Sequence, residues 1–225
     1  MKPRTKWILI ALLLLLAPLW VFGDPPAYFA KEINGQVVDA ATGQPLEGVV
    51  IVAVWKFYSQ GIGSGGHGGA LNTLETITDK DGRYHLPGWG PRPRPPFAYL
   101  DYLDPEITVF KSDYYPESLA NEVVGSGNRN RSVVRTSEWD GKVIKLRPFA
   151  GDWVDYSFKL RTLWDPIGHC VRTCPRLVLA LDAEDKRIKQ VAPKKPVIPT
   201  IVDIDNLRED DRAFLRDFHH GPSKK

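Results

Sequence analysis

The amino-acid sequence predicts a mainly β protein with a short helical extension at its C-terminal end, and three observations lead to this fold class. From residue 32 onward apolar and polar residues alternate, which is the period of a half-buried strand. Turns rich in glycine and proline separate these runs. After Pro148 the apolar spacing shifts towards 3.6 residues, the period of an amphipathic helix. The 225 residues suffice for one core of ordinary size and an appendage, and not for a second full domain.

Residues 1–23 have the composition of an export signal. Basic residues come first, and a continuous apolar stretch follows at 7–16. The basic residues are Lys2, Arg4 and Lys6. Val21 and Gly23 are small enough for the last positions before a signal-peptidase site, which predicts cleavage before Asp24.

The alternative is an anchor that stays in place. The apolar run 7–22 is only a little shorter than the roughly 20 residues that span a bilayer. In both cases we expect the rest of the chain to be exported and to lie in the periplasm, either free or anchored and facing it. Membrane contact is then expected only through residues 1–23, and only if they are uncleaved.

The charge of the chain argues against nucleic acid as its main partner. The 30 basic and 27 acidic residues give +3, and the leader holds three of the basic residues and no acidic one, so the remainder is neutral. Nucleic acid would require a strongly basic face to neutralise its phosphates. We therefore expect a protein or a glycan of the cell envelope as partner. The basic residues between 129 and 147 are expected to form a solvated surface, the alternative being contact with an acidic surface polymer.

The first strands of the fold are predicted between residues 33 and 57. A strand at 33–39 is followed by a turn at 40–48, where glycine and proline recur. The run 49–57 is apolar and rich in β-branched residues. This pattern predicts a strand that is buried on both faces, at the centre of the core.

The next hairpin has a glycine-rich connection. Residues 61–69 contain too much glycine for a regular element and predict a long mobile loop. No Lys-Ser/Thr pair and no helix follow, so a phosphate-binding loop is not favoured. Strands are expected at 71–78 and 83–86 around a turn at 79–82, with Tyr84 facing the core.

The prolines between residues 87 and 96 predict an extended loop at the sandwich edge, because proline cannot donate a backbone hydrogen bond. Short strands are predicted at 106–111 and 142–147. The segment 118–135 between them is polar and contains glycine and asparagine, so it is expected to be poorly ordered.

Three helices are predicted after Pro148. The first carries an apolar stripe made of Trp153, Tyr156, Leu160 and Trp164. The second begins at Pro175, because proline is favourable at the first helical position. The third begins near Asn206, where Glu209 three positions on completes a capping pair. A linker rich in proline and lysine, 192–199, separates the last two.

Two segments of the chain resemble a known family. Residues 33–49 read Ile-Asn-Gly-Gln-Val-Val-Asp-Ala-Ala-Thr-Gly-Gln-Pro-Leu-Glu-Gly-Val, and residues 75–84 read Glu-Thr-Ile-Thr-Asp-Lys-Asp-Gly-Arg-Tyr. Together they resemble the carboxypeptidase regulatory-like domain. The resemblance implies a transthyretin-like β-sandwich over residues 32–149, with 150–225 as a helical extension. Trp55, the glycine and histidine insert and residues 87–91 are similar to a bacterial exported group of unassigned function.

This resemblance does not imply peptidase activity. In the peptidases that give the domain its name, it follows a separate zinc-containing catalytic domain. The five histidines of this chain include no His-x-x-Glu or His-Glu-x-x-His arrangement. A related hydrolase of transthyretin type, which acts on 5-hydroxyisourate, ends in Tyr-Arg-Gly-Ser, whereas this chain ends in His-His-Gly-Pro-Ser-Lys-Lys. No catalytic residue and no cofactor is therefore predicted.

Four residues are candidates for a metal or acid–base site. His67 lies in the glycine-rich loop, which could approach the neighbouring strands that carry Glu75 and His85, and His169 is a further candidate. Nothing in the spacing requires these groups to converge, and surface histidine is the competing interpretation.

Cys170 and Cys174 predict a disulfide, because they lie four positions apart in a chain expected to be exported. Their bond would stabilise the fold only locally. The alternative is a redox role, since Cys174 stands directly before Pro175 and therefore at a helix N-terminus, where thiolate is favoured.

Trp55, Trp89 and Trp139 are candidates for an aromatic platform that binds a sugar or a peptide. The competing interpretation is that they fill the core and hold loops in place.

These observations favour a non-enzymatic binding or structural module of the bacterial cell envelope, whose loops and tail meet a protein or glycan partner. The alternative is a small metal-dependent or acid–base hydrolase that uses His67, Glu75 and His85. A cleft with converging titratable groups would favour the enzyme, and a flat aromatic or strand-edge surface would favour the binding module.

Overall fold

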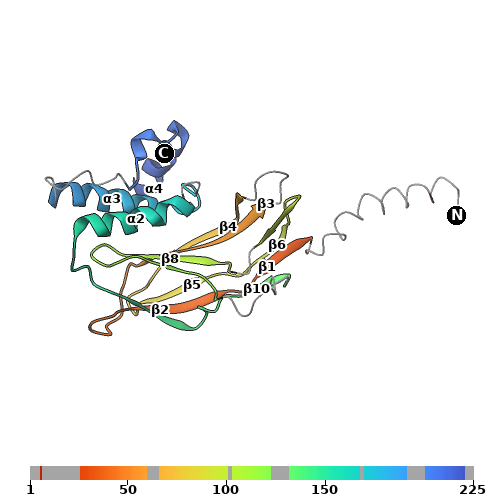
Figure 1. Ribbon diagram of the computed structural model, residues 1–225, viewed down its shortest axis with the longest axis horizontal. Helices are drawn as coiled ribbons and strands as arrows, with labels where there is room; N and C mark the ends of the chain where they lie inside the picture. Colours follow the sequence, from red (N-terminus) through yellow and green to blue (C-terminus); the bar gives the residue numbers. More distant parts are fainter. Residues whose placement is uncertain are drawn as a thin grey trace.

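The structure is a computed structural model that describes residues 6, 26–59, 66–100, 103–122, 132–167, 170–191 and 201–220. Apart from Lys6, the predicted leader lies outside these residues, and so does the predicted linker 192–199. The described chain is a β-sandwich with a short helical extension (Figure 1). This confirms the fold class predicted from the sequence.

The strands of the sandwich form three hydrogen-bonded sheets. The strands are β1 (Ala27–Ala30), β2 (Ile33–Asp39), β3 (Val50–Ser59), β4 (Gly66–Ile77), β5 (Arg83–Leu86), β6 (Trp89–Pro93), β7 (Ala98–Leu100), β8 (Glu106–Phe110), β9 (Glu117–Leu119), β10 (Val134–Arg135) and β11 (Lys142–Leu146). One sheet has the order β11-β2-β5, the second has the order β4-β3-β8-β9 with β7 also paired to β3, and the third has the order β10-β1-β6. The β11–β2 and β10–β1 pairs are parallel, and the other pairs are antiparallel.

Strand β3 is buried on both faces, as its apolar run predicts. Ile51, Ala53 and Trp55 point into the core between the sheets. The alternate residues Val52 and Val54 point the other way, into a second core beneath the helices. An apolar sequence with no alternation is therefore the pattern of a strand that has a layer on each side.

The helical extension covers the outer face of the sheet that contains β3. Its elements are α2 (Trp153–Ile167), α3 (Pro175–Val191), the 3-10 turn η1 (Ile204–Asn206) and α4 (Glu209–His220). Helices α2 and α3 lie side by side over the sandwich (Figure 1). Their buried residues Tyr156, Leu160, Leu177 and Leu181 share the second core with β3. Pro175 is the first residue of α3, as predicted.

The loop predicted at 87–96 contains a strand. Residues Trp89–Pro93 form β6 and pair with β1. Proline is tolerated there because β6 is an edge strand, and an edge strand need not donate along its outer side. The segment 118–135, predicted to be poorly ordered, overlaps β9 and contains β10, while its residues 123–131 lie outside the described chain.

Two further predictions need correction. The loop predicted at 61–69 is paired from Gly66 onward as the start of β4, because glycine tolerates the irregular register there, and its residues 61–65 lie outside the described chain. The last helix begins at Glu209 rather than near Asn206, because Asn206 ends a separate 3-10 turn that is capped by Asp203. The carbonyl of Arg208 accepts the first helical N–H groups of α4 instead.

Among the residues that the structure describes, no helix is both long enough and apolar enough to cross a bilayer.

Candidate functional site

Glu75 on β4 caps a helix instead of joining the histidines. Its carboxylate accepts the backbone N–H of Leu177 at 2.8 Å and that of Arg176 at 3.1 Å, at the start of α3. These N–H groups have no acceptor inside the helix. The Glu75 side chain is 4% exposed, and this burial raises its pKa against the opposing effect of the hydrogen bonds. Glu75 therefore fastens the helical layer to the sheet.

The structure does not bring His85 to Glu75. His85 lies on β5 in the other sheet, is exposed, and has its Nδ1 atom 2.8 Å from Asn34 Oδ1. The backbone of His67 pairs with Tyr58, while its side chain and all of His169 lie outside the described atoms. Within the described ranges, no three His, Cys, Asp or Glu side chains are grouped so that they could hold a metal ion.

Cys170 and Cys174 are joined by a disulfide, and both are buried. The bond closes a tight turn whose Cα atoms are 5.5 Å apart at its ends. Cys174 directly precedes α3, and its carbonyl accepts the N–H of Val178. The closed turn presents Arg172 and Thr173 to solvent.

The three candidate tryptophans all pack on the core between the sheets. Trp55 is 1% exposed and meets Trp89 edge to face, with 5.2 Å between ring centroids. Trp139 is half-buried and donates its indole N–H to the carbonyl of Ala120 at 3.0 Å. A side chain as buried as that of Trp55 offers no face to a ligand, so it fills the core.

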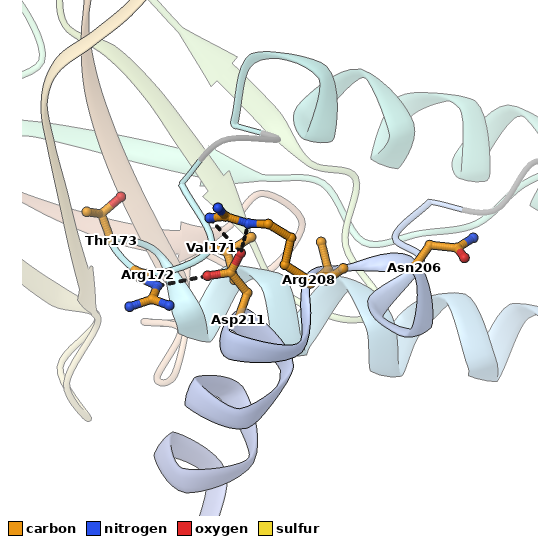
Figure 2. A pocket seen from close by; sticks show the side chains of 7 residues that line it. Val171, Arg172, Thr173, Asn206, Arg208 and Asp211 are labelled. Carbon is orange, nitrogen blue, oxygen red and sulfur yellow. Dashed lines mark hydrogen bonds and ion pairs between the residues drawn. The ribbon is translucent and has the colours of Figure 1, made fainter.

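A cleft opens between the disulfide turn and the start of α4. It encloses about 390 Å³. Its lining consists of Val171, Arg172, Thr173, Asn206, Leu207, Arg208 and Asp211. Figure 2 shows Asp211 between two arginines that come from different elements, one from the disulfide turn and one from the residue before α4.

Asp211 orients both guanidinium groups of this cleft. Arg172 donates from Nε to Asp211 Oδ1 at 2.8 Å, and Arg208 donates from Nε to Oδ2 at 3.3 Å. The Nη2 atom of Arg208 forms an ion pair with the same oxygen at 3.2 Å. The Asp211 side chain is 10% exposed, whereas those of Arg172 and Arg208 are 54% and 80% exposed. The arginines, Arg172 foremost, lower the pKa of Asp211, and Asp211 raises the pKa of Arg172. Arg172, Arg208 and Asp211 together therefore carry a net charge of +1.

Arg172 keeps hydrogen-bond donors for a ligand. Only its Nε atom is bonded to Asp211, and within the described part of the chain its Nη1 and Nη2 groups have no acceptor. Its guanidinium lies 5.9 Å from the ring centroid of Phe214, which helps to fix its plane. A planar fork of N–H donors matches a carboxylate or a phosphate. Val171 and Leu207 add apolar surface beside it.

The acidic residues at the start of α4 are not equivalent. Glu209 accepts from Arg212 and Arg216, so its charge is already compensated. Asp210 is exposed, and its charge contributes to the raised pKa of Arg172. An anion that binds Arg172 would therefore be repelled by Asp210.

Nothing in the sequence indicated this cleft. Arg172 stands between the two cysteines, and Asp211 belongs to a charged run that is typical of an exposed helix start. The two residues are 39 positions apart, and no motif links them. The cysteine pair indicated a closed turn, but not which of its three enclosed residues is exposed, since Val171 is buried while Arg172 and Thr173 are exposed.

Comparison with known proteins identifies neither the family nor the function of the chain. No protein-family model and no curated protein matches the chain. Among solved structures, a streptococcal ancillary pilin is similar at 14% identity and a TM-score of 0.26, over 56% of this chain and 30% of the pilin. The 3-chlorocatechol 1,2-dioxygenase of Rhodococcus opacus 1CP is similar at 14% identity and a TM-score of 0.32, over 54% of this chain and 61% of the enzyme.

These likenesses are too weak to carry an argument about activity. The chain also spans less than two thirds of the length of either protein. The class that the structure itself defines is a β-sandwich with a helical layer on one face.

Proposed function

We propose that this chain is a non-enzymatic binding module of the bacterial cell envelope, of the carboxypeptidase regulatory-like kind, and that its cleft binds a carboxylate of a protein partner. The observation that supports this proposal most directly is the position of Asp211. A carboxylate that is nearly buried holds two exposed arginines in fixed orientations, which lowers the entropy lost when a ligand binds.

The chemistry of the lining favours an amphipathic acid. Arg172 provides free N–H donors for the charged group, and Val171 and Leu207 provide apolar contacts for a neighbouring side chain. A peptide that ends in an apolar residue has both features, a carboxylate and an apolar side chain, on one small unit. A sugar would instead expose hydroxyl groups to the apolar side chains.

The test is an NMR titration of the full-length purified chain with the dipeptide N-acetyl-Ala-Leu as free acid. The Nε–Hε signals of Arg172 and Arg208 report on the cleft. We expect both to shift with the acid and neither to shift with the dipeptide amide, because the amide lacks the charge. Arg172→Gln is expected to weaken binding at least about tenfold, the scale of one charge-assisted contact.

Two further variants separate the cleft from general charge effects. Arg161→Gln removes an exposed arginine from α2 and should leave binding unchanged. Asp210→Asn removes the nearby negative charge and should tighten binding. Equal shifts with acid and amide, or equal losses in Arg172→Gln and Arg161→Gln, would refute the proposal. If an oligogalacturonate shifts these signals and the dipeptide does not, the ligand of the cleft is a glycan and not a protein.

A further inference from the structure

The end of the sandwich formed by the sheet β10-β1-β6 exposes large apolar side chains. They are Phe29 at 38%, Phe97 at 67%, Val133 at 42% and Val134 at 40% exposure. In Figure 1 this sheet lies at the end of the sandwich away from α2 and α3. We call this set of four residues the apolar tip.

Strand pairing places Phe29 and Val134 on one face of the sheet. Phe29 on β1 is the register partner of Val134 on β10, and the backbone N–H of Phe29 donates to the carbonyl of Val133 at 2.9 Å. The Phe29 ring lies against Gly90 of β6, where any Cβ would come within 2.5 Å of the ring. The neighbours Tyr28 and Ala30 point inward and are buried. Phe29 and Val134 therefore face solvent because of the alternation along the strands.

The fourth residue, Phe97, is held outward by a strained turn. Its φ of 55° lies in the left-handed region, which a bulky residue rarely adopts. Arg94 fixes the turn beside the start of β1, because its backbone N–H donates to Pro26 and its Nη1 group donates to Ala98, each at 2.9 Å. Burial of the ring cannot be the reason for this conformation, since Phe97 is the most exposed residue of the apolar tip.

Basic residues and tyrosines accompany the apolar tip. Lys31 follows β1 and Arg92 lies on β6, and both are exposed. Tyr99, two positions after Phe97, stacks on Tyr58 at 5.8 Å between ring centroids. Apolar side chains flanked by lysine, arginine and tyrosine are the composition of a surface that rests in the headgroup region of a bilayer.

The chain leads from this tip directly to its apolar N-terminal run. That run, 7–22, ends four residues before Pro26. Four residues span at most about 14 Å even when fully extended. If the run lies in a bilayer, Pro26 must lie within that distance of the bilayer surface, and the turn that carries Phe97 is joined to Pro26 through the backbone hydrogen bond of Arg94.

We infer that the apolar tip, with Lys31 and Arg92, lies on the surface of an anionic membrane in which residues 7–22 remain as the anchor. The sandwich then stands on the membrane with the cleft of Arg172 directed away from it. The inference does not depend on the ligand of that cleft.

The test is photo-crosslinking from the full-length chain in vesicles of phosphatidylethanolamine and phosphatidylglycerol. Benzoylphenylalanine replaces Phe97 in one sample and Phe158 in the control, since Phe158 is also an exposed phenylalanine, on α2, at 53% against 67% for Phe97. Both samples share the same anchor, so tethering alone affects them equally. We expect at least about five times more lipid adduct from position 97 than from position 158, as detected by mass spectrometry.

Variants then test the surface itself, with the crosslinker at position 134. Combined Lys31→Gln and Arg92→Gln should reduce lipid adducts in the anionic vesicles and leave them unchanged in phosphatidylcholine vesicles. Phe97→Gly should also reduce them without lowering the melting temperature, because glycine accepts the positive φ. Loss of adducts only together with unfolding would contradict the inference.

Other outcomes would overturn it outright. Equal lipid adducts at positions 97 and 158 would show that the tip has no preferred contact with the membrane. Crosslinked products of twice the chain mass from position 97 would show that the apolar tip contacts a second copy of the chain instead of the membrane. An exported protein whose N-terminus is Asp24 would remove the anchor.

Discussion

Removing the Glu75 carboxylate should loosen the helical layer from the sandwich. In Glu75→Ala, the N–H groups of Arg176 and Leu177 lose their acceptor at the start of α3. A hydrogen bond to a charged group contributes about 1.5–3 kcal/mol, and loss of a helix cap typically costs about 1 kcal/mol. Because the two bonds share one carboxylate, we expect a loss of about 3 kcal/mol in the free energy of unfolding.

The assay is thermal unfolding followed by circular dichroism, with hydrogen exchange as the local readout. For a chain of this size, about 3 kcal/mol corresponds to a melting temperature lower by roughly 6–12 °C. The amides of Arg176 and Leu177 should exchange faster. Glu75→Gln keeps one acceptor oxygen and should lose about half as much stability. Glu47→Ala removes an exposed carboxylate from a turn and serves as the control.

The pH dependence provides a second check on Glu75. Burial raises the pKa of Glu75 in the folded protein above its ordinary value of 4.5, so the folded state holds this proton more tightly than the unfolded state does. Its stabilising contribution is therefore full below pH 4.5 and decreases as the pH rises through the raised pKa. The stability difference between the wild type and Glu75→Gln should be larger at about pH 4 than at about pH 7. A melting temperature of Glu75→Ala equal to that of Glu47→Ala, or an unchanged difference between these pH values, would refute the reasoning.

Three other changes have defined outcomes. The double variant Cys170→Ser with Cys174→Ser removes a bond that closes a very short loop, so chain entropy predicts a loss of about 2 kcal/mol in the free energy of unfolding, measured with denaturant. Two thiols that react in the folded wild type would contradict the disulfide. Gly82→Ala should destabilise strongly in the same assay, because φ is +70° and the new Cβ would lie 2.4 Å from the carbonyl oxygen of Val37, so unchanged stability would show that this turn is not strained. Trp55→Ala truncates a core side chain and should lower the free energy of unfolding by about 3–5 kcal/mol. A variant that keeps full stability but loses ligand binding would show instead that Trp55 belongs to a binding surface.

The local pattern of the sequence was sufficient for the main elements of the fold. Alternation predicted that Tyr84 of β5 faces the core, and Tyr84 is buried there. The absence of alternation predicted that β3 is covered on both sides. Pro175 marked the start of α3, because its missing N–H is not needed at that position.

The same reasoning failed where an element depends on its neighbour. The prolines of β6 predicted a loop because local propensity does not show that a strand lies at a sheet edge. Asn206 and Glu209 matched a capping pair by spacing, yet Asp203 and the 3-10 turn occupy that place. Local rules rank conformations of isolated segments, and tertiary contacts shift that ranking.

The sequence by itself determined the mainly β class, the helical extension, the cysteine pair and the apolar N-terminal run, because each depends on composition or on spacing within one segment. Only the tertiary structure decided that Glu75 caps a helix about 100 residues away and that Arg172 meets Asp211. Those contacts join side chains to partners on other elements. Periodicity shows which face of an element is apolar, and it carries no information about which polar group will lie opposite that element once the layers have packed.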